Sequence, residues 1–413
     1  MNQQELIPHL FRTEFRKITA VLCKTFGTAF SGIEMAEDIA SETFLSAIET
    51  WTYKGIPENP TAWLYAVAKN KAKNYIIRNQ LFIDKISNEL KQSSPTTEEV
   101  EIDLSEKNIT DSQLQMLFAV CHPSISTEAQ IGLALRILCG FGIDEIANAL
   151  LSNKETINKR LLRAKEKLRI ENVKIVPIDI GIPGEIDKRL ETVLTTLYLL
   201  FSEGYYSESK DIVLREDLCM EAMRLTYLLV EDEQTNQPNV NALLSLMCFQ
   251  SSRFEARKNT NGEMILYDDQ DKPLWNDELI GKGVYFLHKA SHGNKLSKYH
   301  LEAGIAYWYT IKTDTKEKWE NILQLFNQLI LIDYSPIVAL NRTYALSKAN
   351  GKAEAIIEAE KLQLINNHFY FTLLGELYKG IDDVKARGNF VRASSIAKTS
   401  ADKKIIQKKM ENL

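Results

Sequence analysis

The chain has 413 residues, of which 45% are hydrophobic and 25% charged, and its net charge is −5 at pH 7. This composition is typical of a soluble globular protein and excludes a collagen-like, membrane-embedded or wholly disordered chain. Because single cores stop growing beyond about 250 to 300 residues, we expect more than one domain.

The N-terminal sequence MNQQELIPHLFRTEF lacks the basic start and apolar run of a signal peptide, and no later stretch has about 18 uninterrupted apolar residues. These features predict a cytoplasmic protein that does not enter a membrane. The five cysteines are odd in number and never spaced as C-x-x-C. We therefore expect buried thiols, with neither a disulfide framework nor a zinc site, and no cofactor.

Helical periodicity dominates the chain, and no alternating pattern persists long enough for a sheet, which predicts an all-α protein. Changes of composition divide it into five segments. They are a first helical module at 1–78, an acidic linker at 79–112, a second helical module at 113–170, a short linker at 171–187 and a helical extension at 188–413. The acidic linker has eight Asp and Glu residues against three lysines, so we expect it to be mobile or extended.

Residues 34–51 place apolar side chains at three- and four-residue intervals on one helix face. The opposite face is acidic and contains no Lys or Arg. Its residues are Glu34, Glu37, Asp38, Glu42 and Glu49. DNA would repel this face, which suits a basic or mixed protein partner, although a solvated surface explains it equally well in isolation.

The next helix is predicted to begin after Asn59 and Pro60, a helix-start signal. As far as residue 78, all of its charged residues are basic, and aromatic residues lie between them. They are Lys69, Lys71, Lys73 and Arg78, with Trp63, Tyr65 and Tyr75. Proteins that bind single-stranded nucleic acid use cations along the phosphate backbone and aromatic rings on which the bases stack. Trp63 and Tyr75 are equally well explained as ordinary core residues.

Residues 143–169 read as a short apolar helix, a turn and a longer helix from about Asn153, which is helix-turn-helix spacing. The longer helix has seven Lys and Arg residues against two Glu. In a recognition helix the first turns meet base edges and later basic residues meet phosphates. We expect contacts with duplex DNA from Lys154, Glu155, Thr156, Asn158, Lys159, Arg160, Arg163 and Lys167. The alternative is that this basic face is simply solvated. For Arg160 a second alternative is a structural role or a contact with polymerase.

The order of these elements resembles that in the two domains of extracytoplasmic-function sigma factors of RNA polymerase. The elements are the acidic helix, a loop, the basic aromatic helix, the acidic linker and the helix-turn-helix. AEDIASETFLSAIETW is similar to the polymerase-clamp-binding helix of that family, and NPTAWLYAVAKNKAKNYIIR is similar to its promoter-melting helix. LYLLFSEGYYS and GEMILYDDQDKPLWNDELI resemble the long C-terminal extension of one subgroup, which ends in tetratricopeptide-like repeats. Two residues of the promoter-melting helix depart from the family pattern. Asn74 stands where the family usually has Asp, and Ile77 stands where it often has Arg.

The resemblance implies a protein that is not an enzyme and that binds core RNA polymerase and promoter DNA. Glu37, Asp38 and Glu42 would dock on the clamp helices of the polymerase, and the loop at 51–60 would accept a base flipped from the minus-ten element. The adjoining strand would be held by Lys69, Asn70, Lys73, Asn74 and Arg78, beside Trp63. The helix-turn-helix would read the minus-thirty-five element, and the acidic linker would thread toward the RNA channel.

From about residue 300 the extension reads as helix pairs. Near tetratricopeptide spacing are Gly375, Tyr378, Ala386, Phe390 and Ala393. Such an array offers a surface for a protein partner, or folds back on the preceding domains and regulates them. The acidic run at 268–271 and His288, His292 and His300 are explained by an exposed turn and by helical spacing, so we assign no metal site.

Three other functions remain open at this point. The main alternative is a helix-turn-helix regulator with a tetratricopeptide-like sensor, which binds DNA without polymerase and has no use for residues 34–78. The second is an enzyme targeted by a sigma-like domain, although the chain has no phosphate loop, nucleophile elbow or zinc signature. The third is a scaffold whose N-terminal modules are vestigial.

Overall fold

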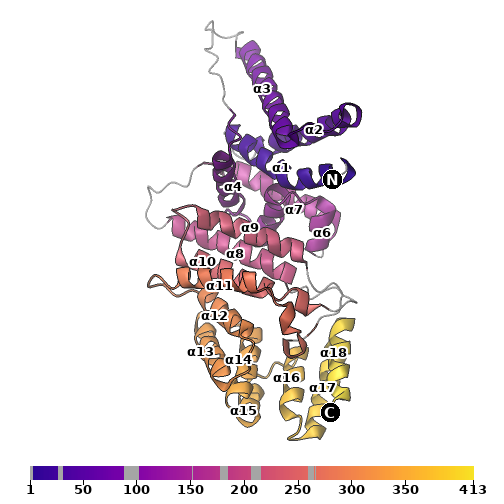
Figure 1. Ribbon diagram of the computed structural model, residues 1–413, viewed down its shortest axis with the longest axis vertical. Coiled ribbons are helices and arrows are strands. Elements are labelled where there is room, and N and C mark those ends of the chain that lie inside the picture. The colour runs from indigo at the N-terminus through magenta and orange to yellow at the C-terminus, as the bar shows by residue number, and fades with distance from the viewer. Residues whose placement is uncertain are drawn as a thin grey trace. The chain divides into compact units, whose positions relative to one another are not determined.

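The computed structural model describes residues 3–26, 31–87, 102–150, 152–176, 185–205, 215–258, 265 and 267–413. The chain is 79% helical, and no strand is found in these described ranges. The prediction of an all-α protein is therefore confirmed. The chain divides into two compact units, residues 1–199 and 200–413, which are described separately below (Figure 1).

The first unit covers the residues of both predicted modules and of the predicted linker between them. Its helices are α1 (Gln3–Thr25), α2 (Ser31–Lys54), α3 (Pro60–Ser87), α4 (Glu106–Val120), α5 (Thr127–Leu133), the π-helical turn η1 (Ala134–Leu138), α6 (Ile143–Ala149) and α7 (Lys154–Ile170). The boundary between the units falls within α8 (Glu185–Tyr205).

Side-chain caps set the starts of α3 and α7. Asn59 Oδ1 accepts a hydrogen bond from the Ala62 amide at 3.0 Å, and Asn153 Oδ1 accepts one from the Thr156 amide at 2.8 Å. These caps satisfy amides that have no partner within the helix. Both starts agree with the sequence prediction, whereas α3 continues to Ser87, well past residue 78.

The core of the first unit joins the two modules. α1 packs against α2 and α3 on one side and against α4 and η1 on the other. Ile18 and Leu22 of α1 are fully buried, as are Met116 and Leu117 of α4. The first part of α8 also packs here, because the Arg189 guanidinium donates to the Phe118 carbonyl at 3.1 Å. The first helix of the expected extension thus contributes to this unit.

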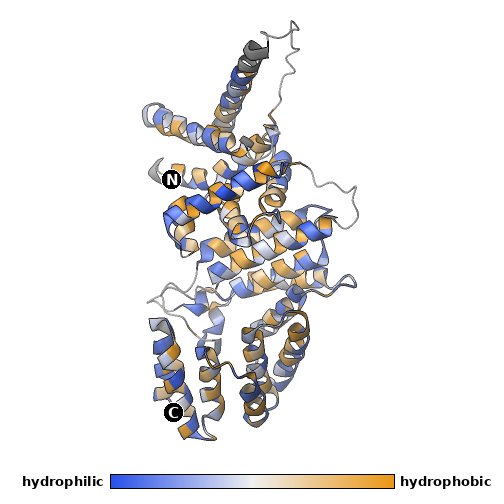
Figure 2. Cartoon of the chain, turned by 180° about the vertical axis from the view of Figure 1, so that it is seen from behind, coloured by the Kyte–Doolittle hydropathy of each residue, from blue (hydrophilic) through white to orange (hydrophobic). Residues whose placement is uncertain are grey.

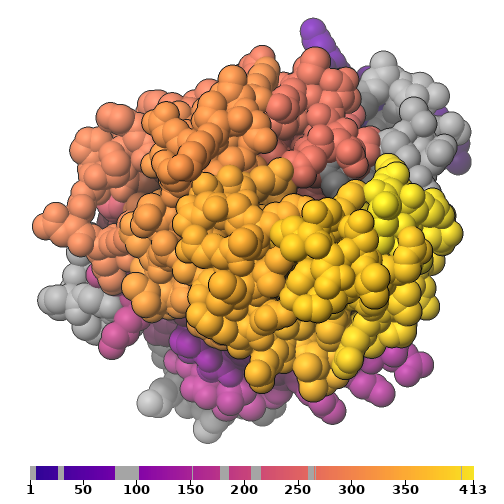
Figure 3. All heavy atoms as spheres, turned by 90° about the horizontal axis from the view of Figure 1, so that it is seen from below, coloured from indigo at the N-terminus to yellow at the C-terminus, as the bar shows by residue number. Residues whose placement is uncertain are grey.

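The second unit is a series of helices in which each packs on its neighbours in the chain. They are α9 (Glu216–Glu231), α10 (Pro238–Ser251), α11 (Asp277–Ala290), α12 (Lys298–Thr310), α13 (Lys316–Ile332), α14 (Pro336–Ala349), α15 (Lys352–Leu362), α16 (His368–Tyr378), α17 (Asp383–Ile396) and α18 (Ser400–Glu411). One hydrophobic cluster runs from Leu301 to Ile406 and links α12 through α18. Figure 3 shows the surface of these helices, from orange to yellow.

The residues that suggested tetratricopeptide spacing lie in this cluster. Gly375, Tyr378, Ala386, Phe390 and Ala393 are all buried at the contact between α16 and α17. Helices of both units carry hydrophobic and hydrophilic residues side by side, as amphipathic helices do (Figure 2). The expected helix pairs are therefore present, and their assignment as tetratricopeptide-like repeats remains a proposal.

The five cysteines are all buried, as expected. Within the described ranges, no helix is long and apolar enough to cross a membrane. The same residues contain no group of His, Cys, Asp and Glu side chains that is placed to hold a metal ion.

Candidate nucleic-acid interface

α7 carries its apolar and its charged side chains on opposite faces. Ile157, Leu161, Ala164 and Leu168 are buried against the rest of the unit. The helix α5 lies close behind, since a Cβ on Gly132 would be 2.9 Å from Cδ2 of Leu161. The residues expected to contact duplex DNA are exposed, apart from the half-buried Arg160. They are Lys154, Glu155, Thr156, Asn158, Lys159, Arg163 and Lys167.

A cavity of about 550 Å³ opens between α7 and the segment that leads into α5. Its wall includes four basic residues of α7 and two serines from the opposite side. The lining residues are Ser124, Ile125, Ser126, Ala129, Thr156, Lys159, Arg160, Arg163, Ala164 and Lys167. Clustered cations and hydroxyl donors are the groups that bind phosphate oxygens. The structure therefore brings Lys159, Arg160, Arg163 and Lys167 together on one hollowed surface.

One acidic residue lies near these cations. The pKa of Glu128 is lowered because its own backbone amide and the Ser126 hydroxyl donate to the carboxylate, with a smaller contribution from the charge of Arg160. At the start of α7, Lys154 pairs with Asp144 at 2.9 Å, but both side chains are well exposed. An exposed pair contributes at most about 1 kcal/mol, so Lys154 remains available to an anionic ligand.

Most of the polar residues of α3 that were expected to hold single-stranded DNA are exposed. Asn70, Lys73, Asn74 and Arg78 are exposed, and Lys69 is half-buried. Lys71 pairs with Glu42 of α2, with 3.2 Å between Nζ and Oε2. The face of α3 that was expected to hold single-stranded DNA is thus available.

The aromatic residues of α3 pack partly against α1 and α2. The Trp63 ring meets the buried Trp51 edge to face, with 5.4 Å between centroids. The Tyr65 hydroxyl donates to the Glu14 carboxylate at 2.6 Å, and burial together with this bond raises the pKa of Tyr65. Tyr75 meets Phe26 edge to face. Trp63 is half-buried, so it packs against the core and still keeps part of its surface exposed; its role in holding a single strand stays a prediction.

The loop expected at 51–60 is shorter in the structure, because α2 continues through Trp51 and Tyr53 to Lys54 and α3 begins at Pro60. Gly55 has φ of 81°, a left-handed conformation that favours glycine. The side chain of Tyr53 just before it is 89% exposed, and Ile56 just after it is 38% exposed. The turn thus presents one aromatic and one aliphatic side chain to solvent beside the basic helix α3.

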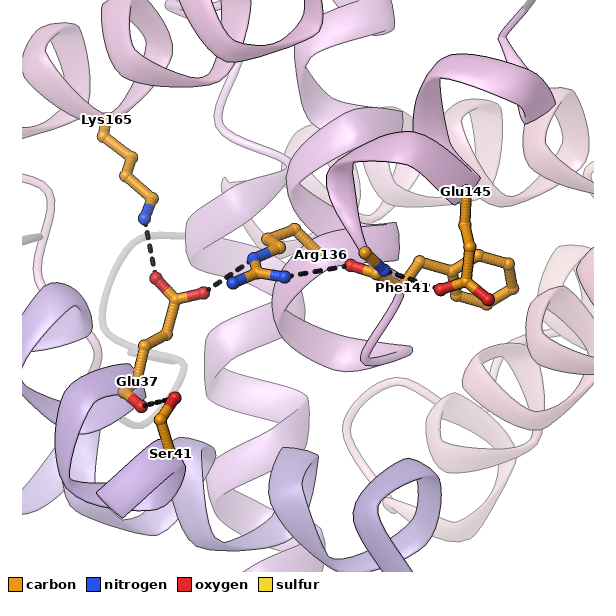
Figure 4. A network of polar contacts seen from close by, with 7 residues as sticks. Glu37, Ser41, Arg136, Phe141, Glu145 and Lys165 are labelled. Atoms are coloured by element: carbon orange, nitrogen blue, oxygen red, sulfur yellow. Dashed lines mark hydrogen bonds and ion pairs between the residues drawn. The ribbon is translucent and has the colours of Figure 1, made fainter. Parts of the chain in front are cut away.

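The three acidic residues expected to bind polymerase fall in two different environments. Asp38 and Glu42 are exposed on α2. Glu37 is buried, and its carboxylate accepts hydrogen bonds from Arg136 Nε at 3.1 Å and from Lys165 Nζ at 2.7 Å (Figure 4). Arg136 lies in η1 and Lys165 lies in α7. The structure therefore separates Glu37 from the two acidic residues with which it was grouped.

Two further contacts hold this group in place. Nη1 of Arg136 donates to the Phe141 carbonyl at 3.2 Å, and Glu145 accepts a hydrogen bond from the Gly142 amide at 2.7 Å (Figure 4). Burial, and next the charge of Glu37, raise the pKa of the nearby Cys23 thiol. The ion pairs thus lie at the edge of the core that joins the two modules.

Sequence reasoning did not assign roles to Arg136, Ser124 and Ser126. Arg136 lies 99 positions from Glu37, so no local pattern links the two residues. Ser126 had a local signal, because serine is common directly before a helix; it precedes α5, although its hydroxyl accepts no hydrogen bond from an amide of that helix.

Two family models match parts of the chain. Residues 10–81, which include most of α1, α2 and α3, match Sigma-70 region 2. Residues 189–291, which run from α8 through α11, match DUF6596, a family of unknown function.

Two curated proteins are similar to the chain. One is an uncharacterized protein of Rhizobium meliloti, 30% identical over 401 residues, which cover 93% of this chain and 91% of that protein. The other is the ECF RNA polymerase sigma-E factor of Haemophilus influenzae, 28% identical over 146 residues, which cover 34% of this chain and 75% of that protein. No solved structure matches the chain.

Proposed function

The chain belongs to the family of the uncharacterized Rhizobium meliloti protein and carries a sigma-70 region 2 domain, and from this premise we propose that it is a sigma factor that recruits core RNA polymerase to promoter DNA. The observation that carries the proposal is the match of residues 10–81 to region 2, because it falls on the acidic helix α2 and the basic helix α3. The similarity to the Haemophilus influenzae sigma-E factor supports the same role.

Within region 2, α2 and α3 take different partners. Asp38 and Glu42 of α2 bind the polymerase, since both are exposed carboxylates on a helix face that DNA would repel. Lys73, Asn74 and Arg78 of α3 hold the separated strand, and the loop at Gly55 receives a flipped base. Trp63 contributes its exposed surface as a stacking platform.

The second module reads duplex DNA. α6 and α7 form a helix-turn-helix in which the first turn of α7 meets base edges. The basic cavity beside it binds the phosphate backbone through Lys159, Arg160 and Arg163. This division follows from the position of Glu155, Thr156 and Asn158 before the run of cations.

The extension regulates the initiation activity or binds a protein partner. Its helices α12–α18 share one continuous hydrophobic cluster, so they act as a single platform rather than as separate helices. A stacked array of this kind presents an extended surface to a protein ligand.

Run-off transcription tests the proposal. The purified full-length chain and bacterial core polymerase are combined with a library of DNA fragments that carry randomised upstream sequences, and the products are sequenced. We expect initiation downstream of one defined pair of promoter motifs, and no such products from core polymerase alone. Binding of a defined operator by the chain without polymerase, and without initiation, would instead support the polymerase-independent regulator.

A further inference from the structure

The charge of the chain is unevenly distributed, and its last helices are strongly basic. Residues 379–413 contain nine Lys and Arg residues against four Asp and Glu residues, a net charge of +5. The whole chain has a net charge of −5, so the other 378 residues together carry −10. A local excess of one sign in a protein of the opposite sign indicates a partner that this region attracts.

The cations of α17 and α18 lie on the surface, whereas the apolar residues of both helices face inward. Phe390 and Ile406 are buried in the hydrophobic cluster of the second unit, and α17 packs against α18. We call the exposed cations of this helix pair and of the turn between the helices the C-terminal basic surface. They are Lys385, Arg387, Arg392, Lys398, Lys403, Lys404 and Lys408. Figure 3 shows the outer surface of these last helices in yellow.

Two polar contacts hold α18 against α16, and each engages a carboxylate. Oδ2 of Asp402 lies 3.5 Å from Nε2 of His368. Oε1 of Glu376 lies 2.9 Å from Nζ of Lys409. In contrast, four cations of the C-terminal basic surface form no ion pair with any residue that the structure describes, namely Arg387, Lys398, Lys403 and Lys408. Their charges are available to an anionic partner.

The apolar side of α18 argues against a membrane as this partner. A helix that lies on a membrane inserts its apolar face among the lipids. In this chain Ile406 is only 2% exposed, and Met410 and Leu413 pack against the same cluster. α18 therefore offers a lipid surface its charges but no apolar anchor. The phosphate backbone of a nucleic acid, in contrast, is bound by clustered Lys and Arg side chains without any apolar contact.

We propose that the C-terminal basic surface binds the phosphate backbone of duplex DNA that flanks the promoter motifs. The inference rests on the proposed function, because that function brings the chain to DNA. Contacts with phosphates alone carry no sequence information, so this surface adds affinity without changing which promoter is read. It is joined to modules that already hold the promoter, and its effective concentration near the flanking DNA is therefore high. Even a weak contact then contributes to binding.

The test neutralises three of the cations that form no ion pair. Arg387→Gln, Lys403→Gln and Lys408→Gln are combined, because glutamine is polar and compatible with an exposed helix position. The full-length chain with core polymerase is titrated with two fluorescent promoter fragments at several salt concentrations. One fragment ends at the promoter motifs. The other carries about 30 further base pairs on each side, or about 100 Å of duplex.

The salt dependence of binding is the readout. On the long fragment, the slope of log affinity against log salt should be smaller in magnitude by about 3 in the triple variant than in the wild type, because each lost phosphate contact removes about 0.9. On the short fragment the two slopes should be equal. Affinity for core polymerase without DNA should be the same for both proteins.

A charge-matched control separates this surface from net charge. Lys282→Gln, Lys289→Gln and Lys295→Gln remove three exposed lysines on α11 and after it, outside the C-terminal basic surface. This control should keep the wild-type slope on both fragments. An equal loss of slope in the two triple variants would overturn the proposal, because net charge would then explain it.

Other outcomes would also decide against the contact. A wild-type slope of the C-terminal variant on the long fragment would overturn the DNA contact alone. An equal fall on both fragments would contradict its assignment to flanking DNA. With unchanged slopes, binding of the wild type but not of the variant to vesicles of phosphatidylglycerol and phosphatidylcholine would identify a membrane surface instead. Failure of the wild type with polymerase to bind either fragment would overturn the proposed function, and the contact with it.

Discussion

A Cβ placed on Gly375 would lie 2.6 Å from Cε1 of Phe390, so α16 and α17 meet there with no room for a side chain between them. Phe390 is fully buried, and the atoms that a Cβ would meet belong to its ring rather than to a flexible chain end. The pair therefore fixes the spacing of these two helices within the hydrophobic cluster of the second unit.

Gly375→Ala should destabilise the protein by about 1 to 3 kcal/mol, because an added methyl in a filled core forces side chains or backbone to shift. The matched control is Gly388→Ala in α17, where a Cβ would meet no atom within 4 Å. That substitution should stabilise the helix by roughly 0.5 to 1 kcal/mol. Urea unfolding followed by circular dichroism compares the two. An equal effect of both substitutions would contradict the close contact.

Lys159→Ala combined with Arg163→Ala should weaken promoter binding by the polymerase complex. Both cations line the basic cavity beside α7, so their loss removes two phosphate contacts. The slope of log affinity against log salt should then decrease in magnitude by about 2. Fluorescence anisotropy at several salt concentrations measures the slope. Removal of the exposed Lys289 and Lys295, which lie outside this cavity, is the charge-matched control, and should leave the slope unchanged.

Lys73→Ala combined with Arg78→Ala should impair DNA opening rather than duplex recognition. Both residues are exposed on α3, and they lie away from the basic cavity of α7. Transcription from an intact promoter should fall about tenfold or more, in line with about 1.4 kcal/mol or more of lost strand contacts. A promoter with an unpaired minus-ten region should restore most of the activity. No rescue by that template would argue against a role in holding the separated strand.

Lys318 predicts a pH dependence of stability in the second unit. Its side chain is 1% exposed, and Nζ donates to Tyr267 Oη at 2.8 Å and to the Ile311 carbonyl at 2.7 Å. Burial lowers the pKa of Lys318 from 10.5 to about 8. The folded state therefore loses this proton at lower pH than the unfolded state, and stability rises with pH between about 8 and 10.5.

Lys318→Met isolates that contribution. The difference in unfolding free energy between wild type and variant should change in favour of the wild type from pH 8 to pH 10.5, by up to about 3 kcal/mol. Below pH 8 the difference should be constant, because Lys318 is then protonated in both states. A difference that stays flat from pH 8 to 10.5 would show that Lys318 keeps its ordinary pKa.

Features that depend on neighbours in the chain can be predicted without a structure. Asn59 and Asn153 mark helix starts because the side-chain oxygen of each accepts a hydrogen bond from the backbone amide three residues ahead. The basic face of α7 follows from helical spacing, since Ile157 and Leu161 turn inward and leave Lys159 and Arg163 outside. The all-α class follows from the same periodicity over the whole chain.

The environment of each charged side chain, in contrast, depends on how distant helices pack. Glu37 and Asp38 are adjacent acidic residues on α2, yet one is buried beside Arg136 and Lys165 and the other faces solvent. The two cations lie 99 and 128 positions away, and such long-range partners leave no periodic trace in a sequence. Local spacing fixes which face of a helix a residue occupies, whereas the packing of distant helices decides whether that face meets water or another charge.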